Sequence, residues 1–142
     1  MPAVTRARPH VGANFLVSFG AGDARSASAG FFEVVFPTFT LEPPDLSPPA
    51  VATAAAPTLV LKRGVTGQLD LYAWWNKARC GKAPQRRTVK VELLAEDHET
   101  VVMTWLFRNA RPVSLAYSPL NALEQSVVIE TLALAFDRME ML

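Results

Sequence analysis

The sequence of 142 residues predicts a single domain of the mainly β (α+β) class with one helix. Three observations support this prediction. Segments rich in aromatic and β-branched residues, which favour strands, recur along the chain. Only residues 68–80 space their apolar side chains as a helix does. Half of the residues are apolar and 19% are charged, which is typical of a chain that buries one sizeable core.

The first half of the chain is expected to contribute three strands. Residues 14–19 (NFLVSF) form a short apolar strand, and residues 58–64 (TLVLKRG) form another. Residues 30–41 (GFFEVVFPTFTL) also have strand composition, but Pro37 cannot donate a ladder hydrogen bond and must lie at an edge, a bulge or a break. Residues 1–12 precede the first strand and are expected to be flexible.

A proline- and alanine-rich segment, residues 42–57, separates the second strand from the third. It has five prolines and few large apolar side chains, so little of it can pack into a core. We therefore expect an exposed, semi-rigid loop. The prolines of its first half are Pro43, Pro44, Pro48 and Pro49.

The third strand leads into the predicted helix, residues 68–80. Thr66 or Gly67 is expected to cap its start, and Gly81 is expected to end it. Asp70 lies in the first turn, where the helix dipole favours an anion. The apolar side chains, spaced i, i+3, i+4 and i+7, are Leu71, Trp74, Trp75 and Ala78. This stripe is expected to cover a sheet.

The second half of the chain is expected to form strands throughout. They are residues 88–95, 101–110, 113–117 and 126–137, with a polar turn at 96–100. The last strand is apolar on both faces, with Val128, Leu132, Leu134 and Phe136 on one and Val127, Ile129, Ala133 and Ala135 on the other. Such a strand must bury both faces, in its own fold or against another subunit. Ala133 and Ala135 are therefore candidate interface residues.

Three charged residues are also predicted to lie at or near subunit contacts. Glu130 interrupts the apolar strand, and a buried glutamate needs a cation or several hydrogen-bond donors. Lys62 and Arg63 end the strand that leads into the helix. For these two cations, an ordinary solvated strand end is the alternative interpretation.

Charge is distributed unevenly along the chain. Residues 62–90 contain eight cations and one acid, whereas residues 91–142 contain three cations and eight acids. A chain with a basic middle and an acidic end can complement a second copy head to tail, although the two segments can also neutralise each other within one fold. The net charge of +1 lacks the basic excess of a typical nucleic-acid-binding protein.

Residues with catalytic or metal-binding chemistry are sparse. Cys80, His10 and His98 are too few for a structural zinc site, and one cysteine excludes an intramolecular disulfide. The acidic residues at 96–100 are best explained as a solvated turn. No catalytic residues, cofactor or metal are expected. A signal peptide and a membrane-spanning run are not expected either, because no segment approaches the ~20 apolar residues that a span requires.

The basic residues 77–90 next to Trp74 and Trp75 allow a further interpretation. Cations beside aromatic rings are also found where proteins bind single-stranded nucleic acid. The two tryptophans lie on the apolar stripe of the helix, however, so the spacing favours core packing over base stacking.

Several motifs together resemble those of phage-type tail tube proteins, including the inner-tube subunits of contractile injection particles. LKRGVTGQLDLYAWWN (61–76) resembles the family's strand–turn–helix motif. Residues 86–136 are similar to its later strands, with WLFRNARP, LNA and VIETLALA in the family's order. NFLVSF and GFFEVVF match the first two strands, so that the resemblance covers residues 14–137.

The resemblance implies a small β-barrel of two packed antiparallel sheets with one flanking helix, as in the type VI secretion tube protein. It implies six-membered rings of identical subunits that stack into a hollow tube within a contractile sheath. Expected partners are further copies, sheath and baseplate proteins, and cargo in the lumen. Neither catalysis nor specific nucleic-acid binding is implied, and the particle would be made in the cytoplasm.

The chain departs from the family at residues 42–57, where relatives have a charged hairpin that reaches the neighbouring ring. Pro43, Pro44, Pro48 and Pro49 would take the place of that inter-ring contact. This departure raises the alternative of a tube-initiating baseplate subunit with the same fold. A nucleic-acid-binding β-barrel is the more distant alternative.

Overall fold

The computed structural model describes residues 8–20, 30–41, 57–81 and 86–142. In these residues the chain forms β1 (Phe15–Phe19), β2 (Phe31–Val35), β3 (Thr58–Gly64), α2 (Asp70–Arg79), β4 (Arg87–Leu94), β5 (Val101–Tyr117), β6 (Ile129–Ala135) and β7 (Arg138–Met141). Residues 1–7 and 42–56 lie outside the described residues. The expectations for a flexible start and for Pro43, Pro44, Pro48 and Pro49 therefore stay predictions.

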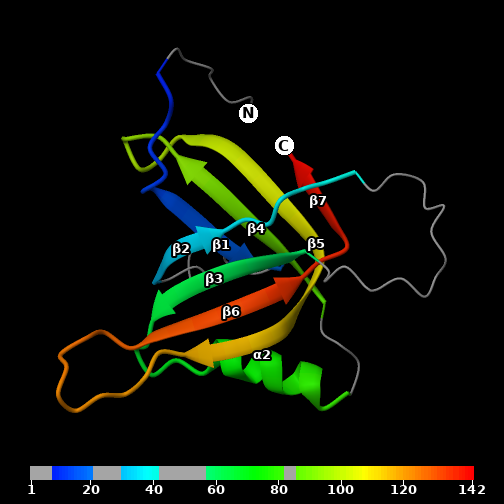
Figure 1. Cartoon of the computed structure of the whole chain (residues 1–142). Helices are drawn as coiled ribbons and strands as arrows, with labels where there is room; N and C mark the ends of the chain where they lie inside the picture. The colour runs from blue at the N-terminus through cyan, green and yellow to red at the C-terminus, as the bar shows by residue number, and fades with distance from the viewer. Residues whose placement is uncertain (1–7, 21–29, 42–56, 82–85) are drawn as a thin grey trace.

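All strand pairs are antiparallel, and the order across the sheet is β1-β4-β5-β6-β3-β2, with β7 also paired to β5. The long strand β5 joins two parts of this sheet. Residues 101–110 of β5 pair with β4, and residues 111–117 pair with β6. Figure 1 shows β5 (yellow) curving from one part to the other. The inner faces meet where the rings of Phe19 and Phe31 contact each other at 5.8 Å.

The prediction of a mainly β fold with one flanking helix is confirmed. The two packed sheets that we expected are the two parts of one sheet, because β5 belongs to both. β1 and β2 end the strand order and do not pair with each other within the described residues, so the barrel is open there. Both end strands keep an unpaired edge, which is a template for contacts with other chains.

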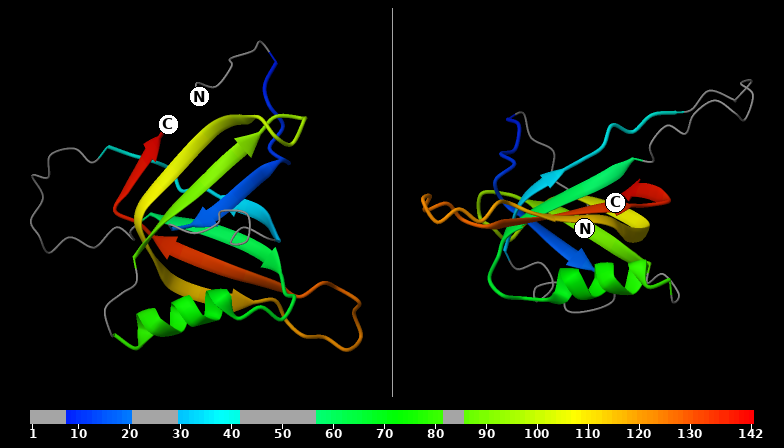
Figure 2. Two further views of the ribbon diagram at one scale, coloured as in Figure 1. Left: turned by 180° about the vertical axis from the view of Figure 1, so that it is seen from behind. Right: turned by 60° about the horizontal axis from the view of Figure 1, so that its bottom comes forward.

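The helix covers the core with only part of its apolar stripe. Leu71 and Trp74 are buried, and the ring of Trp74 lies 5.4 Å from that of Phe19. Figure 2 shows α2 beside the sheet, where it packs against β5. Trp75 is half-buried, and Arg79 lies over its ring at 4.6 Å. Core packing is therefore the role of Trp74, and base stacking is excluded for it.

Several predicted strand boundaries are wrong. The last strand, predicted over residues 126–137, is β6 over Ile129–Ala135. Two further differences occur near prolines. β2 ends at Val35, two residues before Pro37, and Phe36 then packs on Trp105 at 4.9 Å. Residues 101–110 and 113–117 were predicted as separate strands, but β5 runs through the intervening Pro112 with a shift of register between Pro112 and Ser114. A bulge leaves one residue without a ladder bond, so it accommodates a proline.

The helix start and the C-terminus also differ from expectation. Leu69 precedes the helix without a side-chain cap, so neither Thr66 nor Gly67 caps it. Gly81 does follow the helix, with a φ of 72° that suits glycine at this position. β7 was not predicted.

Candidate functional site

Arg63 is a charged residue at a core-facing position of β3. Leu59, Leu61 and Arg63 alternate along the strand and all three are buried. Period-two alternation places them on one face, so Arg63 points inward with the two leucines. Directly opposite, on β6, lies Glu130.

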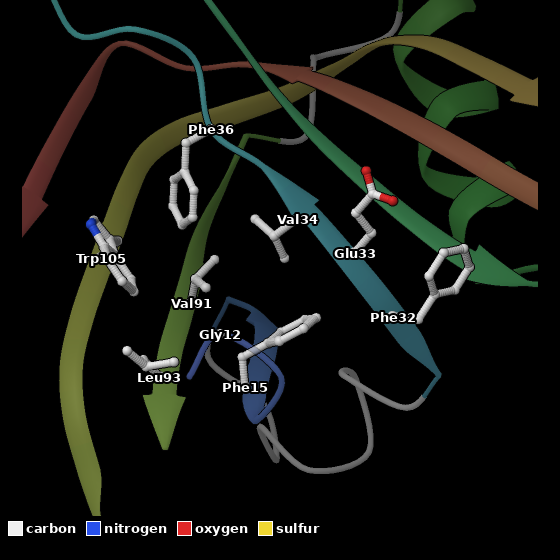
Figure 3. Close-up of a pocket in the computed structure, with 9 residues that line it drawn as sticks. All are labelled: Gly12, Phe15, Phe32, Glu33, Val34, Phe36, Val91, Leu93 and Trp105. Atoms are coloured by element: carbon white, nitrogen blue, oxygen red, sulfur yellow. The ribbon is translucent and has the colours of Figure 1, made fainter. Parts of the chain in front are cut away.

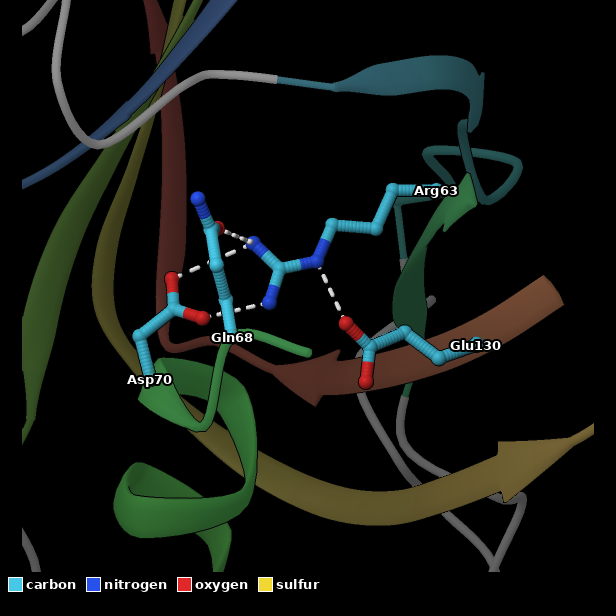
Figure 4. Close-up of polar contacts among 4 residues, drawn as sticks. All are labelled: Arg63, Gln68, Asp70 and Glu130. Atoms are coloured by element: carbon cyan, nitrogen blue, oxygen red, sulfur yellow. Dashed lines mark hydrogen bonds and ion pairs between the residues drawn. The ribbon is translucent and has the colours of Figure 1, made fainter. Parts of the chain in front are cut away.

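The guanidinium of Arg63 joins three elements (Figure 4). Its Nε donates a hydrogen bond to Oε1 of Glu130. Nη2 pairs with Oδ1 of Asp70, the first residue of α2, and Nη1 donates to Oδ2 of the same carboxylate at 3.2 Å. Nη1 also donates to Oε1 of Gln68 at 3.3 Å. One cation thereby connects β3, β6 and the start of the helix.

Burial is unequal within this ion-pair cluster, which consists of Arg63, Gln68, Asp70 and Glu130. The side chains of Arg63 and Glu130 are 3% and 4% exposed, whereas that of Asp70 is 47% exposed. Removing Arg63 would leave Glu130 as an uncompensated charge inside the protein, whereas removing Glu130 would leave Arg63 with only the half-exposed Asp70. The cluster therefore fixes the β3–α2 turn to β6 as long as both buried members are present.

The pKa values in the cluster keep its charges in place. Burial alone would lower the pKa of Arg63, but hydrogen bonds and charges of Asp70 and Glu130 outweigh it and raise the pKa. Burial alone would raise the pKa of Asp70, but the hydrogen bond and charge of Arg63 lower it below the ordinary 3.8. Burial, followed by the charge of Glu130, raises the pKa of Tyr117. These shifts favour a fixed salt bridge rather than proton transfer.

The lowered pKa of Asp70 predicts that part of the stability is lost in acid. Since the folded-state pKa lies below the ordinary 3.8, the contribution is complete above that pH and disappears as the pH falls through the folded-state value. We therefore expect the free energy of unfolding, measured with urea near neutral pH and in acid, to fall more in the wild type than in the Asp70→Asn variant. Glu99→Gln, in the exposed β4–β5 turn, is the control and should follow the wild type. Equal acid losses in wild type and Asp70→Asn would contradict the assignment.

The structure places the predicted interface residues in two different environments. Glu130 has the cation that we predicted, but Arg63 supplies it within the same chain rather than across a subunit boundary. Lys62 points to the opposite face of β3, where it pairs with Glu33 at 3.6 Å and is 35% exposed. Ala133 is half-buried, whereas Ala135 is buried. A role of any of these residues in a subunit contact stays a prediction.

Asp70 and Gln68 were not predicted as members of the cluster. The signal that could have indicated the buried charge is the alternation of Leu59, Leu61 and Arg63, because it places a guanidinium in the core. A buried guanidinium needs carboxylates beside it to compensate its charge. The start of the adjoining helix was the nearest source of one.

The remaining chemically versatile residues are dispersed. Cys80 is exposed. Asp97 accepts hydrogen bonds from Thr100 and from the backbone of the 96–100 turn, and those bonds lower its pKa to about 2. In the described residues, no group of three His, Cys, Asp or Glu side chains is arranged to hold a metal ion. No helix in the described part of the chain is long and apolar enough to cross a membrane.

Comparison of sequences finds one family. The family model of the T4-like virus tail tube protein gp19 matches residues 50–140. No curated protein sequence matches the chain.

Comparison of structures finds similar folds in contractile assemblies. A chain of the PVC sheath–tube complex, an extracellular contractile injection system in the extended state, aligns with a TM-score of 0.76 and 20% identity over 96% of this chain and 93% of that chain. A chain of the anti-feeding prophage baseplate aligns with a TM-score of 0.76 and 25% identity over 96% and 97%. Hcp1 from Flavobacterium johnsoniae aligns with a TM-score of 0.58 and 16% identity over 89% and 94%. These similarities confirm the expected tube-protein fold.

Proposed function

The chain belongs to the family of T4-like virus tail tube proteins, and we propose on this premise that it is a structural subunit of the hollow inner tube of a contractile injection particle. Six copies form a ring, and rings stack into a rigid tube that is driven through a target envelope with cargo in its lumen. The observation that carries the proposal is the family match over residues 50–140, which spans β3 to β6 and most of β7.

The proposed role requires contacts rather than catalysis. Sheath and baseplate proteins of the same particle are the proposed partners besides further copies, as the similarity to the sheath–tube and baseplate structures suggests. The particle would be assembled in the cytoplasm. The segment 42–57, with Pro43, Pro44, Pro48 and Pro49, is proposed to meet the neighbouring ring.

A tube-initiating baseplate subunit is the second candidate function. The observation that favours it is the 25% identity to the chain of the anti-feeding prophage baseplate, against 20% for the sheath–tube complex. The same fold could therefore form the first layer of a tube instead of its repeating layers.

Negative-stain microscopy of the purified protein tests these functions directly. We expect stacked rings or tubes from a repeating tube subunit and isolated rings from a tube initiator. A monomer that retards DNA in a gel would instead support the nucleic-acid-binding alternative and overturn both.

A lysine substitution on β6 tests the interface prediction. Ala133→Lys adds a charge at a half-buried position outside the core, so the interface prediction expects rings to be lost while the circular dichroism stays unchanged. If the Ala133→Lys variant forms rings of unchanged appearance, Ala133 does not belong to the subunit contact. Ala135→Lys cannot serve this purpose, because Ala135 is 4% exposed and a lysine there would destabilise the monomer itself.

A further inference from the structure

The hollows on the described surface of the protein differ in chemistry. One, with a volume of about 250 Å³, lies between β2 and the β1–β4–β5 part of the sheet and is lined mainly by apolar side chains such as Phe15, Phe36 and Trp105 (Figure 3). Another, with a volume of about 560 Å³, is lined only by polar residues, which are Thr88, Arg108, Asn109, Asp137 and Arg138. We call it the polar hollow, and its lining has the chemistry that a charged ligand requires.

A bulge in β5 places two neighbouring side chains at the polar hollow. The register between β4 and β5 shifts here, with one residue more on β5 than on β4. Phe107 and Ala110 are both buried. The two residues between them, Arg108 and Asn109, therefore both lie on the side of the strand away from the core. Bulges are frequent next to functional sites, where they redirect a side chain.

Two guanidinium groups face each other across the polar hollow. Arg108 on β5 is the direct partner of Arg138 on β7. Like charges directly opposite each other destabilise a strand pair. Glu140 compensates part of this repulsion, because its carboxylate pairs with Arg108 at 3.4 Å and with Arg138 at 2.5 Å. The hydrogen bond from Arg108 lowers the pKa of Glu140, so this carboxylate stays ionised.

Asp137 brings two more arginines to the polar hollow. Its Oδ1 pairs with Arg111 at 2.9 Å, and its Oδ2 pairs with Arg86 at 3.4 Å. Asn109 Nδ2 donates a further hydrogen bond to Oδ2 at 3.1 Å. The hydrogen bond from Arg111 lowers the pKa of Asp137, so this second carboxylate stays ionised as well.

The positive charge of this arginine cluster exceeds its negative charge. Its members are Arg86, Arg108, Arg111, Arg138, Asp137 and Glu140, and four cations against two acids leave an excess of two positive charges. Every arginine has a carboxylate partner, but four guanidiniums carry about twenty N–H donors, whereas two carboxylates offer roughly eight lone pairs. Donors are therefore left over, and all four side chains reach solvent, from 32% exposed for Arg111 to 72% for Arg138.

We infer that the polar hollow binds a terminal phosphate group, either free phosphate or a phosphate monoester, between Arg108 and Arg138. Such a phosphate carries a charge of about −1.5 to −2 near neutral pH, which matches the excess of the cluster. Guanidinium forks bind phosphate oxygens in pairs. The oxygens of a tetrahedral anion point in several directions, as do the donors of β5, of β7 and of Thr88 on β4.

One subunit carries the whole polar hollow, so phosphate binding and ring formation can be measured separately. Loss of phosphate binding would leave the proposed tube function standing. Absence of rings or tubes would leave the phosphate site standing.

Isothermal titration calorimetry at constant ionic strength tests the site, with inorganic phosphate and phosphoserine as probes. Arg138→Gln should weaken phosphate binding at least about tenfold, because charge-assisted hydrogen bonds are lost. Lys62→Gln is the matched control and should bind like the wild type, since it removes an exposed cation that does not line the polar hollow. Both variants should keep the wild-type melting temperature without ligand, because both side chains are exposed to solvent.

A second pair of variants predicts a change in the opposite direction. Glu140→Gln removes the carboxylate that competes for Arg108 and Arg138, so it should tighten phosphate binding several-fold. Glu33→Gln changes the net charge of the protein equally but lies on β2, away from the polar hollow, and should leave the affinity unchanged. Equal tightening in both variants would reduce the effect to net charge and overturn the inference.

The two probes also distinguish the sources of the phosphate. Tighter binding of phosphoserine supports a monoester as the ligand, and equal or tighter binding of inorganic phosphate supports the free ion. Absence of binding by both probes, or equal affinities in the wild type and Arg138→Gln, would overturn the inference. Binding of a single-stranded oligonucleotide or of a glutamate-rich peptide, without binding of either probe, would likewise overturn it and assign the arginines to a different kind of partner.

Discussion

Replacing Arg63 with methionine should lower the free energy of unfolding by about 3–5 kcal/mol, because Glu130 would remain buried without its cation. Urea unfolding followed by circular dichroism measures this change. Lys62→Met is the matched control: Lys62 is the preceding residue, and its exposed pair with Glu33 should contribute only about 0–1 kcal/mol. Equal small losses in both variants would mean that the buried pair does not hold the fold.

A partner substitution separates the cost of an orphaned charge from the value of the pair. Glu130→Leu alone leaves Arg63 with the half-exposed Asp70, and it should also be destabilising. The double variant Arg63→Met with Glu130→Leu should recover much of the loss, since a well-packed apolar pair often matches a buried ion pair. A double variant as unstable as the sum of the single variants would contradict this explanation.

Replacing Trp74 with alanine should cost about 3–5 kcal/mol, the range for removing a large aromatic side chain from a core. Trp74 is 1% exposed and packs beside Phe19, with Arg87 over its ring at 4.9 Å. Trp75→Ala is the control on the same helix, and it should cost much less because Trp75 is half-buried. Thermal or urea unfolding of both variants provides the comparison. A larger loss of unfolding free energy for Trp75→Ala than for Trp74→Ala would contradict the assignment of Trp74 to the core.

The parts of the fold that local chemistry determines were predictable. Residues 58–64 hold the short apolar run of Leu59, Val60 and Leu61 between turn-forming neighbours, and the structure has β3 over the same residues. The helical stripe of Leu71 and Trp74 likewise identified the face of α2 that the core covers. The helical stripe repeats with the period of a helix, and the strand is a short local run of apolar residues, so a single sequence suffices for both.

The parts that depend on distant neighbours were not predictable. The chemistry of proline predicts a strand break at Pro112, but β5 continues through it, because the bulge that accommodates the proline depends on pairing with β6. The partner of Glu130 required the register between β3 and β6, since Arg63 lies 67 positions earlier in the chain. From the distribution of charge along the sequence, the cation that pairs with Glu130 could belong to the same chain or to a neighbouring copy. Only the three-dimensional arrangement distinguishes these two possibilities.

The order of the strands also governs how fast an assembly-competent subunit can form. β1 pairs with β4 and β3 pairs with β6, so the first half of the chain has to wait for the second before its sheet is complete. Proteins dominated by such long-range pairings fold over roughly milliseconds to seconds, because the entropic cost of closing a long loop arises before the stabilising contacts can form. During synthesis, the edge of β3 stays open until β6 leaves the ribosome, and an open edge recruits other nascent chains. We therefore expect substitutions that slow the pairing of β1 with β4 or of β3 with β6 to reduce the yield of folded subunits.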